Sequence, residues 1–264
     1  MALRWSAHIS WLFGELPYLE RVGAARRAGF RQIETAWPGA QERRGLAAAL
    51  AASDISVALL NCDAGDLAAG ERGFAGDPAR REELERAFLA AAELAGAIGA
   101  SSVNLLVGRE LPGLGRARQR SAVIGALRAL APEAAARGLR ILIEPLNAVE
   151  NPGYLAPTPR EAVALIEACG SDAVGLLLDV YHVACGGGDP RADIRSFAAL
   201  IGHVQIADFP GRGPPGSGAL GLWDILERLD ASGYTGAVGL EYAPLGINGS
   251  SLTFLSDARS VVRL

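Results

Sequence analysis

The chain has 264 residues, 50% of them hydrophobic, and a formal net charge of −4. This length and apolar content are sufficient for a large buried core, while the slightly acidic balance excludes a basic nucleic-acid surface and a polybasic membrane-binding segment. All 25 positively charged side chains are arginines, which excludes enzymes that depend on a lysine Schiff base, on pyridoxal phosphate attachment or on a P-loop lysine.

Eight short apolar runs alternate with longer segments rich in Ala, Leu, Arg and Glu. Several of the runs are nearly continuous in apolar residues, which is typical of parallel strands covered on both faces. The predicted strands begin at Leu3, Arg31, Ile55, Ser101, Arg140, Ala173, Ile201 and Gly236.

Helical periodicity between these runs predicts helices over residues 17–28, 77–98, 116–137, 158–169 and 222–231. Asp77 and Thr158 each precede a proline, the signature of an N-cap followed by proline in the first helical turn. Pro132 is expected to kink or break the helix in which it lies.

Strict alternation of strand and helix predicts an α/β fold, a single (β/α)8 TIM barrel occupying residues 1–264 as one domain. An open doubly wound sheet is the alternative. Residues 64–79 form the longest stretch without clear structure. Because they follow the third strand, a barrel would place them over the face that carries active sites.

Four consecutive predicted strands each bring one oxygen-bearing side chain to their carboxyl end: Glu144, Asp179, Gln205 and Glu241. Each of them alone could be only the solvated first residue of a loop. A carboxylate at the end of an apolar run is expensive to bury unless it is paired or bound to a metal. An all-oxygen set favours one divalent ion, Mg²⁺ or Mn²⁺, over Zn²⁺.

Further polar residues lie near these positions in the sequence. Glu150, His182 and Arg212 are candidates for holding the oxygens of a small polar substrate, and an arginine suits a bidentate grip on a carboxylate. Arg72, beside Glu71 in the loop after the third strand, is a weaker candidate, because a surface role fits it equally well. Residues 211–216 formally match a dinucleotide fingerprint, but two prolines and the late position argue against that interpretation.

At these residues the sequence resembles the hydroxypyruvate isomerase family, within the xylose-isomerase-like barrel superfamily and close to the 2-oxo-tetronate isomerases. The resemblance covers almost the whole chain. It is carried by the stretches SAHISWLFGE, AGDLAAGERG, IEPLNAVENPGY, LLDVYH, IGHVQIADFPGRGPPGSG and GLEY.

The resemblance implies that the four strand-end residues ligate the metal and that Glu144 and Glu241 also act as the acid/base pair. It points to His182, Arg212 and Glu150 as substrate contacts. The implied reaction is a metal-assisted aldose–ketose type isomerisation, hydroxypyruvate to tartronate semialdehyde, through an enediolate. Alternatives are a 2-oxo-tetronate isomerase, a ketose epimerase, an endonuclease-type barrel and a non-catalytic metal- or sugar-binding barrel.

The three cysteines, Cys62, Cys169 and Cys185, are an odd number without metal-site spacing, so free thiols in a reducing compartment are expected. No secretory signal is apparent, and no run of about 18 apolar residues suggests a membrane span. The expected location is the cytoplasm, with no membrane and no nucleic-acid partner. Helix faces rich in Ala and Leu are compatible with a homo-oligomer and equally with simple covering of a core.

Overall fold

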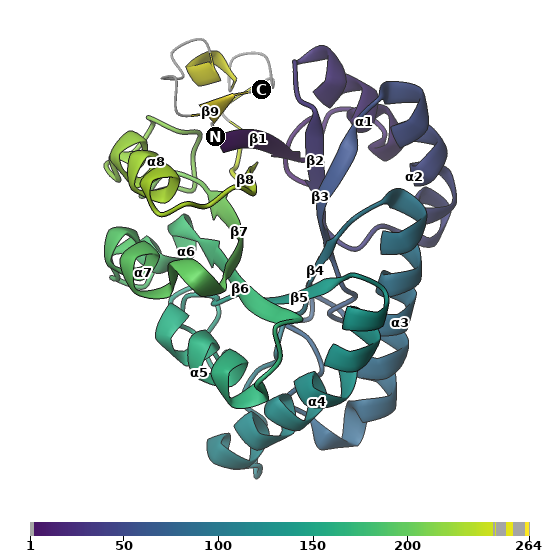
Figure 1. Ribbon diagram of the computed structural model, residues 1–264, viewed down its shortest axis with the longest axis vertical. Coiled ribbons are helices and arrows are strands. Elements are labelled where there is room, and N and C mark those ends of the chain that lie inside the picture. The colour runs from purple at the N-terminus through teal and green to yellow at the C-terminus, as the bar shows by residue number, and fades with distance from the viewer. Residues whose placement is uncertain (1–2, 245, 247–251, 256–261, 264) are drawn as a thin grey trace.

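The computed structural model describes residues 3–244, 246, 252–255 and 262–263. Eight strands form a closed barrel, since every pairing is parallel and β1 pairs with both β2 and β8 (Figure 1). This confirms the predicted barrel. The strands are β1 (Leu3–His8), β2 (Gln32–Thr35), β3 (Ser56–Asn61), β4 (Ser102–Asn104), β5 (Arg140–Ile143), β6 (Val174–Asp179), β7 (Ile201–Ile206) and β8 (Ala237–Leu240), and a short β9 (Val262–Arg263) pairs with β1.

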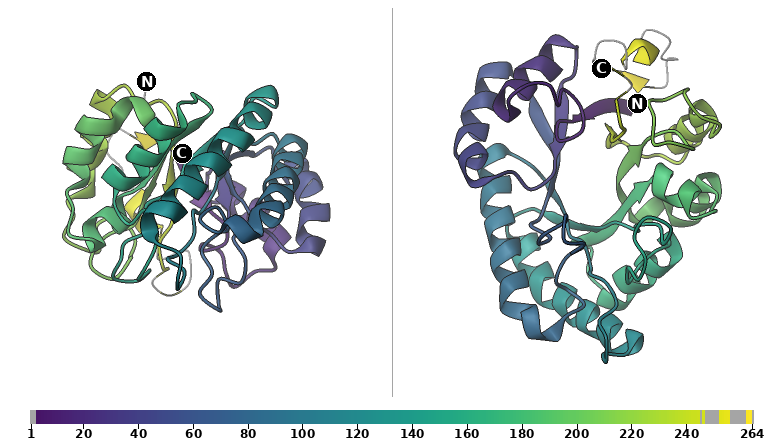
Figure 2. Two further views of the ribbon diagram at one scale, coloured as in Figure 1. Left: turned by 90° about the horizontal axis from the view of Figure 1, so that it is seen from below. Right: turned by 180° about the vertical axis from the view of Figure 1, so that it is seen from behind.

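The helices surround the strands as an outer ring (Figure 2). They are α1 (Tyr18–Arg27), α2 (Ala40–Ser53), α3 (Arg81–Ile98), α4 (Arg116–Ala136), α5 (Pro159–Cys169), α6 (Val180–Cys185), α7 (Pro190–Phe197) and α8 (Leu222–Ala231), with 3₁₀ turns at Pro78–Arg80, Ala198–Leu200 and Thr253–Leu255. Among the described residues, no helix combines the length and the apolar character that a membrane crossing requires.

Both predicted capping residues accept a backbone hydrogen bond, but Asp77 caps the 3₁₀ turn Pro78–Arg80, and α3 itself begins at Arg81. Asp77 accepts a hydrogen bond from the backbone N–H of Ala79, and Thr158 accepts one from Glu161. Of the two effects predicted for Pro132, a kink or a break, the break does not occur, because α4 runs through it. Pro132 lacks a backbone N–H, so the helix loses one hydrogen bond. Neighbouring residues such as Leu130 and Ala134 are buried, and their packing holds the helix together despite this loss.

Helices α2, α6 and α7 lie in segments for which we predicted no specific helix. α2 is largely alanine and buries only Leu46 and Leu50, so its sequence shows little periodicity. α6 and α7 have six and eight residues, too few for a clear helical pattern.

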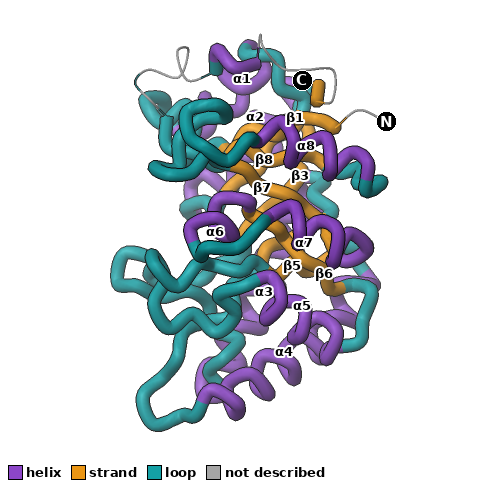
Figure 3. The backbone as a smooth tube through the Cα atoms, turned by 90° about the vertical axis from the view of Figure 1, so that its left-hand side faces the viewer, coloured by secondary structure: helices purple, strands orange, loops and turns teal. Residues whose placement is uncertain are grey.

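The inside of the barrel sets the position of the polar residues. Leu59, Leu142 and Leu177 form a buried apolar cluster separate from the main core. Because side chains alternate along a strand, the residues two positions later point to the same side. Those residues are Asn61, Glu144 and Asp179, so the barrel changes from apolar to polar at the carboxyl ends of its strands. The longest loops gather mostly on one side of the barrel, as Figure 3 shows.

Candidate active site

A cavity of about 440 Å³ lies at the carboxyl ends of the strands. Six of the eight side chains predicted as site residues line it: Arg72, Glu144, Glu150, His182, Arg212 and Glu241. The other two, Asp179 and Gln205, are each 1% exposed, and their Cα atoms are register partners on β6 and β7. The structure therefore brings all eight predicted residues to one end of the barrel.

Three carboxylates converge there, joined by two basic side chains. His182 Nε2 lies 4.0 Å from Glu144 Oε1 and 3.7 Å from Asp179 Oδ2. Arg212 Nη2 lies 3.3 Å from Asp179 Oδ2 and 2.8 Å from Glu241 Oε1. Ligand atoms of Glu144, Asp179 and His182 all lie within 4.8 Å of one another, and Glu241 belongs to a second group of the same spacing with His8 and Glu34.

Burial and mutual repulsion make these carboxylates difficult to ionise together. Burial, followed by the charge of Asp179, raises the pKa of Glu144 to about 8. Burial raises the pKa of Asp179 to about 6 although Arg212 opposes the shift, and it raises the pKa of Glu241 well above the ordinary value. Three ionised carboxylates and Arg212 carry a net charge of −2, which one divalent cation would neutralise.

Gln205 fits a ligand role by its orientation. Its Nε2 donates to Glu34 Oε1 at 3.2 Å, while its Oε1 is buried and has no hydrogen-bond partner among the described residues. An unpartnered buried oxygen costs about 1–3 kcal/mol, so a cation facing it would be favourable.

His182 is held as a neutral hydrogen-bond donor. The backbone N–H of Asn147 donates to His182 Nδ1 at 3.3 Å, which leaves the ring proton on Nε2, facing Glu144 and Asp179. Burial and the nearby Arg212 lower the pKa of His182 to about 3. Its Nε2–H is suited to donating to a substrate oxygen rather than to binding a metal.

Arg212 is more enclosed than a solvated loop residue. Its guanidinium lies over the rings of Trp11 and Tyr181, at 4.6 Å and 4.9 Å from their centroids. Its backbone φ of 52° is unusual for a residue other than glycine. Ring stacking and the ion pairs with Asp179 and Glu241 together hold the charge at the cavity wall.

Glu150 and Arg72 line the outer part of the cavity. Burial alone raises the pKa of Glu150, but hydrogen bonds from Tyr181 and Asn147 bring it below the ordinary value. Arg72 donates through Nε to Asn151 Oδ1 at 2.8 Å and has no ion-pair partner among the described residues. Glu71 instead pairs with Arg80, so of these two neighbouring charged residues Arg72 is the one that lines the cavity.

Sequence reasoning missed the supporting residues of the first four strands. His8 Nε2 lies 3.7 Å from Glu241 Oε2, and Asn104 Nδ2 donates to Glu144 Oε2 at 2.6 Å. Glu34 is fully buried and accepts a hydrogen bond from His203 Nε2 at 2.5 Å. His8 and Asn104 are the last residues of β1 and β4, so their place at strand ends was an available signal, whereas Glu34 lies within β2 and its partners are distant in the sequence.

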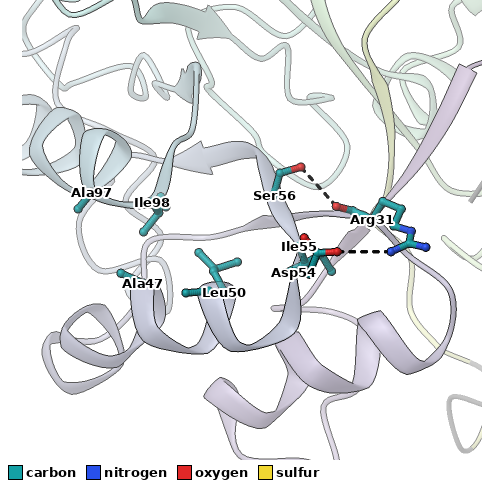
Figure 4. Close-up of a pocket in the computed structure, with 9 residues that line it drawn as sticks. Arg31, Ala47, Leu50, Asp54, Ile55, Ser56, Ala97 and Ile98 are labelled. Atoms are coloured by element: carbon teal, nitrogen blue, oxygen red, sulfur yellow. Dashed lines mark hydrogen bonds and ion pairs between the residues drawn. The ribbon is translucent and has the colours of Figure 1, made fainter.

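A second cavity of about 540 Å³ lies at the opposite end of the barrel, near the start of β3 (Figure 4). Its lining combines apolar residues such as Leu50 and Ile98 with an ion pair between Arg31 and Asp54 at 3.7 Å. Asp54 is 93% exposed in that pair, so its charge is solvated. The cavity offers space without a convergent reactive group.

The model of the xylose isomerase-like TIM barrel family matches residues 22–257. The chain belongs to this family. A putative hydroxypyruvate isomerase of Mus musculus is 38% identical, over 96% of this chain and 94% of that protein. The hydroxypyruvate isomerase of Escherichia coli is 35% identical, over 97% and 100%. A 2-oxo-tetronate isomerase of Cupriavidus necator is 34% identical, over 96% and 97%.

These relatives identify the chain as an isomerase of this family and confirm the resemblance seen in the sequence. Among solved structures, one described as an AP endonuclease, family 2, from Brucella melitensis superposes with a TM-score of 0.93 at 33% identity. That match covers 98% of this chain and 100% of the other.

Proposed function

We propose that this isomerase interconverts hydroxypyruvate and tartronate semialdehyde with the help of one divalent metal ion. The observation that carries the proposal is the gathering of the carboxylates of Glu144, Asp179 and Glu241 around Arg212 at a cavity of about 440 Å³. Glu144 and Asp179 are buried, and Glu241 is 12% exposed. A cavity of this size suits a small hydroxy-carbonyl acid, and its three carboxylates call for a cation.

The residues present fit Mg²⁺ or Mn²⁺. Glu144, Asp179, Gln205 and Glu241 would hold the ion through oxygen atoms, which these cations prefer. The orphaned Oε1 of Gln205 supports this assignment. When bound, the ion stabilises the negative charge that develops on two neighbouring oxygens of the substrate.

Glu144 and Glu241 would move the protons. The reaction removes a proton from the carbon that carries the hydroxyl group, forms an enediolate and returns a proton to the neighbouring carbon. Both carboxylates line the cavity, so each can reach a bound substrate, and a carboxylate in this position is a suitable general base. One of the pair handles the carbon-bound proton and the other the hydroxyl proton.

Four side chains would orient the acid. His182 can donate from Nε2 to a substrate oxygen, and Glu150 can accept from a hydroxyl. Arg72 and Arg212 line the same cavity and supply positive charge for the carboxylate group. With both ion-pair contacts of Arg212 directed to carboxylates of the site, Arg72 is the better candidate for the direct grip.

A 2-oxo-tetronate isomerase is the second candidate, supported by the 34% identical relative of that name. A ketose has no carboxylate group for the protein to bind. The two arginines that line the cavity therefore argue against a ketose epimerase. An endonuclease function is disfavoured by the net charge of −4, because phosphate backbones are bound through surplus positive charge.

The decisive test is turnover followed by NMR, with protein stripped by a chelator and then supplied with Mn²⁺ or Mg²⁺. Hydroxypyruvate, 2-oxo-tetronate and a free ketose are compared at equal concentration. Metal-dependent conversion of hydroxypyruvate with the highest kcat/KM supports the proposal. Preference for 2-oxo-tetronate favours the second candidate, and the absence of turnover with every substrate favours a non-catalytic binding barrel.

A further inference from the structure

The Glu34 carboxylate lies inside the barrel and contacts the strand on the far side of β1 and β8. Glu34 belongs to β2 and is 0% exposed, yet its two oxygens accept hydrogen bonds from His203 and Gln205, both on β7. Gly239 of β8 lies against it: a Cβ at that position would come within 2.1 Å of Glu34 Oε1. The glycine therefore leaves the space that this carboxylate occupies.

The chemistry of the contact fixes the orientation of Gln205. An ionised carboxylate only accepts hydrogen bonds, so the carboxamide must face Glu34 with its NH₂ group. Its Oε1 consequently points away from Glu34, and it is buried without a partner among the described residues. The Cα of Gln205 is the register partner of Asp179, so the two side chains extend from neighbouring strands at the same level of the barrel.

We propose that Glu34 is a positioning residue, which holds the carboxamide of Gln205 with its oxygen toward the divalent cation. The inference rests on the metal site of the proposed function. His203 supports the arrangement, since its Nε2–H occupies the other oxygen of Glu34 at 2.5 Å. Groups that orient a metal ligand in this way commonly change metal affinity by about 10–100-fold when they are replaced.

A direct ligand role for Glu34 is the competing explanation. Ligand atoms of His8, Glu34 and Glu241 lie within 4.8 Å of one another, close enough to bind a second ion. However, both oxygens of Glu34 already accept hydrogen bonds from β7. The positioning role predicts one cation per chain, while the ligand role predicts two.

The test is a titration of the full, metal-stripped protein with Mn²⁺, read by electron paramagnetic resonance for affinity and stoichiometry. In Glu34→Gln, His203 still donates to the oxygen of the new side chain, whose NH₂ then faces Gln205. Two NH₂ groups cannot face each other, so the Gln205 amide must turn and offer its nitrogen to the cation. Mn²⁺ should bind about 10–100-fold more weakly, still as one ion per chain.

The exchange Glu34→Gln/Gln205→Glu tests the orientation itself. It keeps the net charge and the hydrogen bond, now donated from position 34 to position 205, and returns an oxygen to the cation. Mn²⁺ affinity should recover to within a few-fold of the wild type. Glu93→Gln, the same chemical change at an exposed position on α3, should leave affinity unchanged.

The fold of each variant is checked by circular dichroism and thermal unfolding. If Glu34→Gln does not fold, the exchange variant decides alone, because recovered binding supports the proposal and lost binding overturns it. Wild-type affinity in Glu34→Gln, or two ions in the wild type and one in that variant, also overturns it. A wild type that binds no Mn²⁺ would instead refute the metal site of the proposed function, and the inference with it.

Discussion

The two halves of the barrel contribute different chemistry to the same cavity. Strands β5, β6 and β8 bring the carboxylates of Glu144, Asp179 and Glu241 to their carboxyl ends, and β7 brings the carboxamide of Gln205. Strands β1 to β4 bring the neutral groups His8 and Asn104 to the same level, and burial lowers the pKa of His8 to about 4. The carboxylates assigned to metal binding and proton transfer thus belong to one half, while the carboxylate of Glu34 on β2 faces β7.

Each supporting group in the first half contacts a member of the second. Asn104 donates to Glu144, His8 lies beside Glu241, and Glu34 accepts from Gln205. Buried polar groups need such partners, and the contacts also restrict the side chains that would touch metal and substrate. One half therefore supplies the reactive charge and the other fixes its direction.

The sharpest way to break this division is to neutralise a carboxylate of the second half. Glu144→Gln and Glu241→Gln should each lower kcat by about 10³-fold, because proton transfer by a positioned base contributes about 10²–10⁴-fold. Steady-state turnover of hydroxypyruvate measures the effect. Unchanged thermal unfolding is the control, and a near-normal rate in either variant would contradict the assigned pair.

A smaller loss is expected when the charge is removed from a ligand that does not move protons. Asp179→Asn should weaken Mn²⁺ binding by about 100-fold. Replacing a group that only orients a metal ligand lowers metal affinity by up to about 100-fold, and replacing a ligand should cost at least as much. Calorimetric titration of the stripped protein gives the affinity. Asp230→Asn, at an exposed position on α8, is the matched control. Equal affinity in the two variants would remove Asp179 from the metal site.

The positions of Glu144 and Asp179 at one end of the barrel could be predicted from the sequence because their signal is local. Glu144 and Asp179 each end an apolar run, and the barrel pattern alone places such residues at one face. Glu34 of the first half escaped prediction because its signal is non-local. Glu34 and His203 are separated by 169 positions, and only the closed barrel makes them neighbours. Their pairing depends on barrel closure and on the space at Gly239, which no local spacing encodes.

Removing a supporting group from the first half should have a moderate effect. Asn104→Ala deletes the donor to Glu144 Oε2, a hydrogen bond to a charged group, so kcat should fall about 10-fold. The control is Asn61→Ala, which removes a carboxamide from the adjacent strand. Among the described residues, the Asn61 side chain makes no hydrogen bond to Glu144. Equal losses in both variants would show that Asn104 acts only by filling space.

The loop after β3 extends the first half to substrate recognition. Arg72→Gln should raise the KM for hydroxypyruvate about 10-fold with little change in kcat, because a charged hydrogen bond to the substrate is lost. Arg86→Gln, on α3 with 70% of its side chain exposed, is the control. A fall in kcat without a change in KM would instead assign Arg72 to the chemical step.

The smallest expected effect is the pH dependence of thermal stability, which arises from the carboxylates of the second half. Burial raises the pKa of Glu144 from 4.5 to about 8 and that of Asp179 from 3.8 to about 6. Between the unfolded and folded pKa values, the folded, metal-stripped protein therefore holds more protons than the unfolded chain. Its stability should therefore fall as the pH rises from about 4.5 to 8. Mn²⁺ competes with those protons, so its stabilising effect should grow over the same range.

Differential scanning calorimetry should show a Tm increase with Mn²⁺ that is a few degrees larger at pH 8 than at pH 5, and Asp179→Asn should reduce that difference. An increase independent of pH would mean that Glu144 and Asp179 are already ionised before the cation binds.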